Sequence, residues 1–195
     1  MRKYLFALLL ASVLIVFSGC DVTITSNGPN GPVSLPTLPG VSTSTGSSSS
    51  GPAHLGVQKK TSGCKAHGGL PDSACTPGAV FSNATPQVIC VSGYTRTVRN
   101  VPFSEKDQVY AEYGIFNHVP GQYEVDHLVP LELGGSNDIA NLWPEAASPT
   151  PGFHEKDQVE NYLHDQVCSG AMSLKDAQKE IATNWLAVYN RMTKQ

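Results

Sequence analysis

The sequence has little positive charge, few aromatic residues and no apolar run long enough for a transmembrane helix. Of its 195 residues, 13 are Lys or Arg and 16 are Asp or Glu. A protein that binds nucleic acid over a broad face needs clustered Lys and Arg to neutralise the phosphates. The composition therefore argues against a broad basic surface, and a small patch or a bound metal ion would have to take its place in any contact with phosphate.

The first residues have the features of an export signal. Arg2 and Lys3 precede an apolar run from Tyr4 to Phe17. This run of about 14 residues is shorter than the roughly 20 that a helix needs to cross a bilayer. A signal peptide over residues 1–19 is therefore the preferred interpretation. Its removal leaves 11 basic and 16 acidic residues, a net charge near −5.

The four residues Phe17-Ser18-Gly19-Cys20 resemble the lipobox of bacterial lipoproteins, although Phe17 stands where that pattern prefers Leu. The resemblance implies that Cys20 becomes the acylated first residue. The protein would then be exported and anchored by this lipid to the bacterial cell envelope, on the periplasmic or extracellular face. An ordinary secretory signal with an incidental cysteine is the alternative. No protein partner can be inferred from the sequence.

Residues 20–60 lack the large apolar side chains that a folded domain buries. After Cys20 they consist mostly of Gly, Ser, Pro and Thr, including the run from Ser42 to Gly51. Such a segment cannot bury enough apolar surface to offset the entropy of ordering. We therefore predict a disordered linker over 20–60 and one folded domain over 61–195.

Four cysteines fall in this domain, namely Cys64, Cys75, Cys90 and Cys168. An even number in an exported chain predicts two disulfides. The sequence does not fix the pairing, and we prefer Cys64 with Cys75 and Cys90 with Cys168. A zinc site made by Cys64, His67 and either Cys75 or Cys90 is the alternative, but its spacing does not match a C-x₂-C knuckle.

The apolar spacing predicts a domain of the α+β class. We expect a strand over 88–92, a helix that Ser104 caps and Gly114 ends, and a second helix over 154–167. A third helix should follow the cap Ser173. Its apolar residues share one face, which should be buried: Leu174, Ala177, Ile181, Trp185, Val188 and Met192.

The segment from Glu124 to Glu145 carries the most informative motif. Its residues resemble the core of HNH endonucleases of the ββα-metal type in Asp126-His127, Pro130-Leu131, Gly134-Gly135, Asn141-Leu142 and Pro144. A similarity to a group of exported bacterial HNH proteins extends further, through Tyr110–Gly114, Phe153–Asp157, Glu160-Asn161 and Val167–Gly170.

The resemblance implies a β-hairpin laid on a helix, with a broad loop between strands over 125–129 and 139–142. Additional helices and the disulfides would complete the fold. Gly134 and Gly135 would allow the sharp reversal of the chain. Neighbouring residues of an extended segment point to opposite sides. Asp126 and His127 should therefore face different surroundings.

The resemblance also implies the roles of the site residues. Asp126 would be a metal ligand, His127 the general base that deprotonates a water, and Asn141 the residue that orients the His127 ring. His154 is the best candidate for a second metal ligand that converges with Asp126. Asn161 is its reserve, because the interval from Asn141 to His154 is longer than in many HNH proteins. The expected cofactor is a divalent cation, Mg²⁺ first, with Mn²⁺, Ni²⁺ or Zn²⁺ as alternatives.

The expected function is metal-dependent hydrolysis of phosphodiester bonds in nucleic acid, DNA first and RNA as the alternative, outside the cytoplasm. For contact with the substrate phosphate, Arg96, Arg99 and Lys156 are the nearest basic residues in sequence, but no cluster of basic residues surrounds the motif. A function of another class is a non-catalytic envelope lipoprotein that uses the HNH scaffold as a binding module. The acidic net charge supports this second interpretation.

Overall fold

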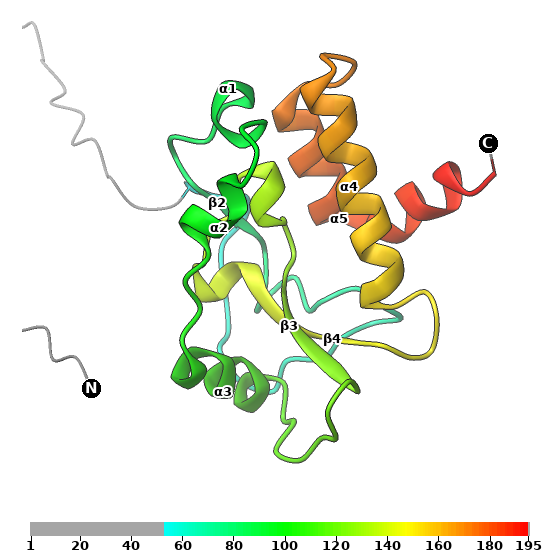
Figure 1. The fold of residues 1–195 in the computed structure, drawn as a ribbon. Helices are drawn as coiled ribbons and strands as arrows, with labels where there is room; N and C mark the ends of the chain where they lie inside the picture. Colours follow the sequence, from blue (N-terminus) through cyan, green and yellow to red (C-terminus); the bar gives the residue numbers. More distant parts are fainter. Residues whose placement is uncertain (1–52, 195) are drawn as a thin grey trace, which may run out of the picture. The chain divides into compact units, whose positions relative to one another are not determined.

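The computed structural model describes residues 53–194, which lie within one compact unit (Figure 1). The predicted signal peptide over 1–19, the predicted lipidation site Cys20 and most of the predicted linker lie outside the described residues. The described part mixes helices and strands and contains two disulfides, as expected for the α+β class. None of its helices is long and apolar enough to cross a membrane.

The elements follow one another along the chain with short strands first and the two longest helices last. They are β1 (Ala53–His54), β2 (Ala79–Val80), α1 (Pro86–Ile89), α2 (Tyr94–Val98), α3 (Phe103–Glu112), β3 (Tyr123–His127), β4 (Leu142–Ala146), α4 (Phe153–Cys168) and α5 (Leu174–Met192). Two 3₁₀ turns, η1 (Leu131–Leu133) and η2 (Ile139–Asn141), lie between β3 and β4.

Residues 53–60, which precede the predicted start of the folded domain at residue 61, form backbone contacts with the segment 74–80. Strand β1 pairs antiparallel with β2. The Leu55 amide donates to the Gly78 carbonyl at 2.9 Å, and the Lys59 amide donates to the Ala74 carbonyl at 2.7 Å. These contacts use backbone atoms, so the apolar content of the segment did not indicate them.

Strands β3 and β4 form an antiparallel hairpin in which Asp126 lies opposite Trp143 and His127 lies opposite Leu142. The predicted hairpin is present, but β3 begins and ends two residues before the predicted strand. The predicted second strand over 139–142 is mostly the turn η2, and β4 follows it. The cause is a cap: the Asp138 carboxylate accepts from the Ala140 amide at 2.8 Å and starts the turn.

The loop between the strands closes tightly at its glycines. Gly134 has φ +75°, and a Cβ atom on Gly135 would lie 1.8 Å from the Val129 carbonyl oxygen. No side chain fits at Gly135 unless the backbone moves. The predicted role of this glycine pair in the reversal is therefore consistent with the structure.

Helices α4 and α5 lie side by side and supply most of the apolar core (Figure 1). The predicted face of α5 is confirmed at five positions, because Leu174, Ala177, Ile181, Trp185 and Val188 are all buried. The predicted cap is confirmed as well, since Ser173 Oγ accepts from the Asp176 amide at 3.1 Å. Helix α5 has a kink at Asn184, where φ is −168° and ψ is 83°.

Two predicted local features are wrong. The expected strand over 88–92 begins inside the short helix α1, because Pro86 occupies a first-turn position where its fixed φ favours a helix. Ser104 does not cap α3. Helix α3 starts at Phe103, so its N-cap is Pro102, two residues before the predicted cap.

The preferred disulfide pairing is confirmed. Cys64 is bonded to Cys75, which closes a local loop with a sequence separation of 11. Cys90 is bonded to Cys168, 78 residues away, and this bond ties the end of α1 to the end of α4. Two disulfides fit an oxidising environment outside the cytoplasm.

Candidate functional site

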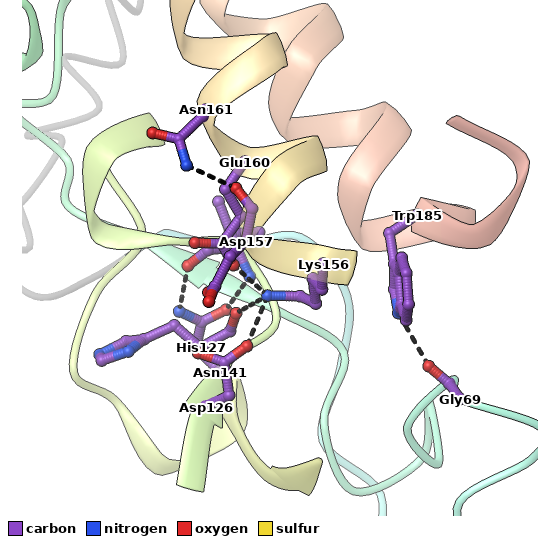
Figure 2. Close-up of polar contacts among 10 residues, drawn as sticks. Gly69, Asp126, His127, Asn141, Lys156, Asp157, Glu160, Asn161 and Trp185 are labelled. Carbon is purple, nitrogen blue, oxygen red and sulfur yellow. Dashed lines mark hydrogen bonds and ion pairs between the residues drawn. The ribbon is translucent and has the colours of Figure 1, made fainter. Parts of the chain in front are cut away.

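Strand β3 separates Asp126 from His127, as expected for neighbours on an extended segment. The Asp126 carboxylate faces the first turns of α4, whereas the His127 ring points away from that helix (Figure 2). The two side chains therefore lie in different chemical surroundings, although they are adjacent in the chain.

Lys156 of α4 is the centre of the charged cluster on the Asp126 side. Its side chain is fully buried, and Nζ donates to Asp126 Oδ2 at 2.6 Å and to the His127 carbonyl oxygen at 2.8 Å (Figure 2). A third bond goes to Glu160 Oε1. An ammonium group has three protons, so Lys156 is fully satisfied. It is not available to contact a substrate phosphate, which the sequence had suggested.

The charges of Asp126 and Lys156 are set by burial and by the attraction between the two groups, which act in opposite directions. Burial alone would raise the pKa of Asp126, but the Lys156 ammonium outweighs it and holds that pKa below its ordinary value. Burial alone would lower the pKa of Lys156, but Asp126, Glu160 and Glu145 raise it above its ordinary range. At neutral pH Asp126 is therefore a carboxylate and Lys156 an ammonium.

The cluster holds more carboxyl groups than one ammonium can neutralise. Glu145 on β4 is fully buried, and neither of its carboxyl oxygens has a hydrogen-bond partner in the structure. Burial raises the pKa of Glu145 to about 10. Burial also raises the pKa of Glu160 to about 8, although Lys156 opposes the change. At neutral pH, protons on these two groups offset the shortage of positive charge.

The His127 ring is held in one tautomer by Asn137. The ring is only 3% exposed, and its Nε2 lies 3.2 Å from Asn137 Oδ1. Asn137 Nδ2 donates to the Val98 carbonyl at 2.7 Å, which fixes the amide with its oxygen toward the ring. We therefore assign the ring proton to Nε2 and the free lone pair to Nδ1. Burial lowers the pKa of His127 to about 4, so the ring is neutral at pH 7.

Asn141 holds the base of the loop between the strands. Its fully buried side chain accepts from the Val129 amide at 2.9 Å and donates to the carbonyls of Val129 and Ser136, both at 2.9 Å. The residue that contacts the His127 ring is Asn137. Asn141 thus acts on the backbone that follows His127, and the orientation of the ring comes from a residue that the sequence did not single out.

The predicted ligands on α4 do not meet Asp126 in the structure. His154 is exposed and its ring lies against Phe153, with 4.3 Å between the ring centroids. No ion pair joins His154 to Asp126 among residues 53–194. Asn161 is also exposed and donates to the Asp157 carbonyl at 2.7 Å.

The phase of the helix explains this result. Successive residues of an α-helix are about 100° apart, so His154 lies about 160° around α4 from Lys156, the residue that faces the hairpin. Asp157 follows Lys156 on this helix and is an exposed carboxylate. Burial and then the charge of Asp126 raise the pKa of Asp157, which places the two carboxylates within electrostatic reach.

Arg99 is the basic residue that the structure places on the His127 side. It is exposed, and its charge contributes to lowering the pKa values of His127 and Glu124. Arg96 is exposed on α2. Arg99 is therefore the predicted phosphate contact that lies closest to the site.

Sequence reasoning missed four residues of the site: Asn137, Glu145, Lys156 as an ion-pair partner, and Glu160. Lys156 and Glu160 are four residues apart, which is the spacing of a helical ion pair and the one signal available in the sequence. The burial of Glu145 depends on how α4 lies on the hairpin, so no local pattern could have indicated it.

A second group of side chains could hold a metal ion. The ligand atoms of Cys90, His164 and Cys168 all lie within 4.8 Å of one another, and it is the one such group of three among the described residues. In this structure the two cysteines are joined by the disulfide. The group differs from the zinc alternative that the sequence offered, because Cys64 is bonded to Cys75.

Comparisons with known proteins supply no relative for this chain. No family model, no curated protein and no solved structure matches it. The functional argument therefore depends on the residues of the site themselves.

Proposed function

We propose that this protein is a metal-dependent nuclease of the HNH type that hydrolyses phosphodiester bonds of DNA outside the cytoplasm. In this proposal Cys20 carries the lipid that anchors it to the cell envelope. One observation carries the proposal: at the end of β3 the Asp126 carboxylate faces α4, while the adjacent His127 points the other way and bonds through Nε2 to Asn137, which leaves Nδ1 for a water. General-base chemistry near neutral pH needs a neutral imidazole such as that of His127.

The oxygen donors near Asp126 fit a hard divalent cation such as Mg²⁺. Carboxyl groups outnumber ammonium groups here, and the charge of Asp126 contributes to raising the pKa values of Asp157, Glu124 and Glu145. A divalent cation would relieve this crowding. Asp126 and Asp157 are the residues that we expect to hold it, in place of the His154 that the sequence favoured. Such a cation supplies stabilisation of the charge on the phosphate and on the leaving oxygen.

The residues on the other face supply the proton transfer. A water that reaches His127 Nδ1 can give its proton to the ring, because Nε2 is already protonated and bonded to Asn137. Asn137 keeps the ring from rotating, and the exposed Arg99 offers a positive charge to the substrate phosphate. Asn141 keeps Val129, two residues after the base, in place.

The direct test uses the full chain and supercoiled plasmid DNA, with Mg²⁺ or Mn²⁺ and with excess chelator. We expect cleavage that requires the metal and that Asp126→Asn abolishes, while Asp165→Asn, at an exposed position on α4, cleaves as the wild type does. Circular dichroism should show that each variant is folded. A folded wild type that cleaves neither plasmid nor RNA with any of Mg²⁺, Mn²⁺, Ni²⁺ or Zn²⁺ would contradict the proposal.

One observation favours the second candidate, a non-catalytic envelope lipoprotein that uses the same scaffold for binding. Lys156 places its ammonium on Asp126, the carboxylate that the nuclease needs for a metal ion. If Lys156 replaces the cation permanently, then no metal should activate cleavage. In the nuclease proposal Lys156 instead orients Asp126, and the cation binds at the oxygens that Lys156 leaves free. The same plasmid assay separates the two functions.

A further inference from the structure

Cys90 of the Cys90–Cys168 disulfide lines a small cavity that contains neither Asp126 nor His127. The cavity has a volume of about 160 Å³ and is lined by the segment 89–95 together with Glu132 and His164. Cys168 Sγ lies 3.3 Å from His164 Nε2, on the same side of α4 one turn away. The sulfurs of Cys90 and Cys168 and the imidazole of His164 thus meet at one place, and Glu132 lines the cavity beside them.

Glu132 gives an independent sign that a ligand is missing from this place. Its Oε1 is buried and has no hydrogen-bond partner in the structure. Burying such an acceptor without a partner is costly, and buried polar oxygens almost always have one. His164 is near enough to oppose the rise in the pKa of Glu132 that burial causes. An acceptor without a donor, in a cavity that Cys90 and His164 also line, is a position that a cation could satisfy.

The other disulfide has no such surroundings. Cys64 and Cys75 are both buried, and within residues 53–194 no histidine or carboxylate joins them in a possible metal group. A structural cross-link therefore does not need a neighbouring imidazole and carboxylate. The arrangement around Cys90 and Cys168 is particular to that bond.

We propose that reduction of the Cys90–Cys168 disulfide converts this cluster into a binding site for a borderline-soft divalent cation, Zn²⁺ first. The ligands are Cys90 Sγ, Cys168 Sγ, His164 Nε2 and a carboxylate oxygen of Glu132. Two thiolates, one imidazole and one carboxylate make a four-coordinate set that suits Zn²⁺. This site is independent of the proposed nuclease function.

The chemistry balances as a two-electron exchange. A dithiol reductant supplies two electrons and two protons, the sulfur–sulfur bond breaks to give two thiols, and the reductant becomes a disulfide. Binding of Zn²⁺ then releases the two thiol protons and leaves two thiolates on the metal. Either the covalent bond or the metal ion joins the end of α1 to the end of α4, so this connection persists when the disulfide is reduced.

The test uses the full chain with Cys20→Ser, Cys64→Ala and Cys75→Ala, so that Cys90 and Cys168 are the remaining cysteines. The protein is reduced with a dithiol, freed of reductant without oxygen, and titrated with Co²⁺. Thiolate-to-cobalt charge-transfer absorbance reports binding. We expect one Co²⁺ per reduced chain, displacement by Zn²⁺, and no such absorbance for the oxidised chain.

Matched variants test the individual ligands. His164→Ala and Glu132→Gln should each weaken Co²⁺ binding by about 10-fold or more, whereas His67→Ala, an exposed histidine, should titrate like the parent. If the cysteine-depleted parent is unfolded by circular dichroism, the same titration of the reduced wild type is compared with Cys90→Ser/Cys168→Ser. The proposal is overturned if the reduced protein shows no charge-transfer band, if the Cys90→Ser/Cys168→Ser protein shows the same band, or if either ligand variant binds like its parent.

Discussion

The two halves of helix α4 are held in place by different forces. In the first half, Lys156 and Glu160 enter a buried cluster of charged and protonated groups around Asp126. In the second half, Leu163 and Val167 belong to the apolar core, and the helix ends at the disulfide to Cys90. One helix therefore combines a charged attachment to the hairpin with an apolar and covalent attachment to the rest of the domain.

This difference bears on the function of the first half. Apolar burial stabilises a fold outright, at roughly 25 cal/mol per Å² of buried surface. A buried ion pair gives little net stability compared with apolar residues of similar volume, because desolvation offsets the attraction. We therefore interpret the charge cluster as serving the chemistry of Asp126 more than the stability of the fold.

The largest expected effect on stability comes from breaking the cluster on one side. Lys156→Met should lower the free energy of unfolding by roughly 3 to 5 kcal/mol, because Asp126 then loses its buried counter-charge and Glu160 loses its hydrogen-bond donor. Urea unfolding followed by circular dichroism measures the change. Lys175→Met, at an exposed site on α5, is the control and should unfold like the wild type. A Lys156→Met protein within about 1 kcal/mol of wild type would show that the cluster does not hold this half of α4.

Removal of the Cys90–Cys168 disulfide, at the end of the second half of α4, should lower the free energy of unfolding. Cys90→Ser/Cys168→Ser should cost roughly 4 kcal/mol, because the bond closes a loop with a sequence separation of 78. The Cys64–Cys75 disulfide closes a loop with a sequence separation of 11. Cys64→Ser/Cys75→Ser should therefore cost roughly 3 kcal/mol. Thermal unfolding of both variants under oxidising conditions gives the comparison. A smaller loss for the long loop than for the short one would contradict this assignment of stability.

The pH dependence of stability should come from the charged cluster that contacts the first half of α4, and mainly from Glu145 on β4. Unfolded Glu145 releases its proton above pH about 4.5, whereas folded Glu145 keeps it up to about 10. The folded state binds the extra proton in this window, so its stability falls as pH rises, by up to about 1.4 kcal/mol per pH unit. Glu145→Gln, which mimics the protonated group, should lose less stability than wild type between about pH 5 and about pH 8.

Asp165→Asn is the control for this comparison, because it removes one exposed carboxylate, on α4. Its stability should change with pH as that of the wild type does. Equal pH slopes for wild type and Glu145→Gln would mean that Glu145 is not protonated in the folded protein.

The smallest expected effect is at a helix end outside both regions. Ser173→Ala should lower the free energy of unfolding by about 1 kcal/mol, because Ser173 Oγ accepts from the Asp176 amide at the start of α5. Urea unfolding can resolve a loss of this size. Ser169→Ala, near the C-terminal end of α4 and exposed, serves as a control at a hydroxyl that caps no N-terminus. If the two substitutions cost the same, the cap contributes nothing particular.

The sequence allowed prediction of features that depend on short-range patterns. The apolar face of α5 and the cap Ser173 follow from spacing within one element, and the hairpin with its glycine turn followed from the resemblance of its motif. The disulfide pairing was a preference that the structure confirms. The strand expected over 88–92 failed because a short apolar run cannot by itself distinguish a strand from a helix.

The charged cluster could not be predicted, because it depends on the rotation of α4 about its own axis. The rotation that turns Lys156 toward the hairpin turns His154 toward solvent. The sequence does not indicate which of the two residues faces the hairpin. The tautomer of His127 likewise depends on Asn137, which the loop brings to the ring from ten residues away. Contacts between elements, rather than patterns within them, determine this site.

The rate of plasmid cleavage by His127→Gln tests the central claim most directly. Glutamine is close to histidine in size and polar, so the variant keeps the buried position filled, and circular dichroism can verify its fold. With saturating Mg²⁺ or Mn²⁺, the account predicts that the rate falls by about 100-fold or more, because the general base is lost. His67→Ala, at an exposed histidine, should keep the wild-type rate. A folded His127→Gln protein that keeps more than about a tenth of the wild-type rate would contradict the role of His127 as the base.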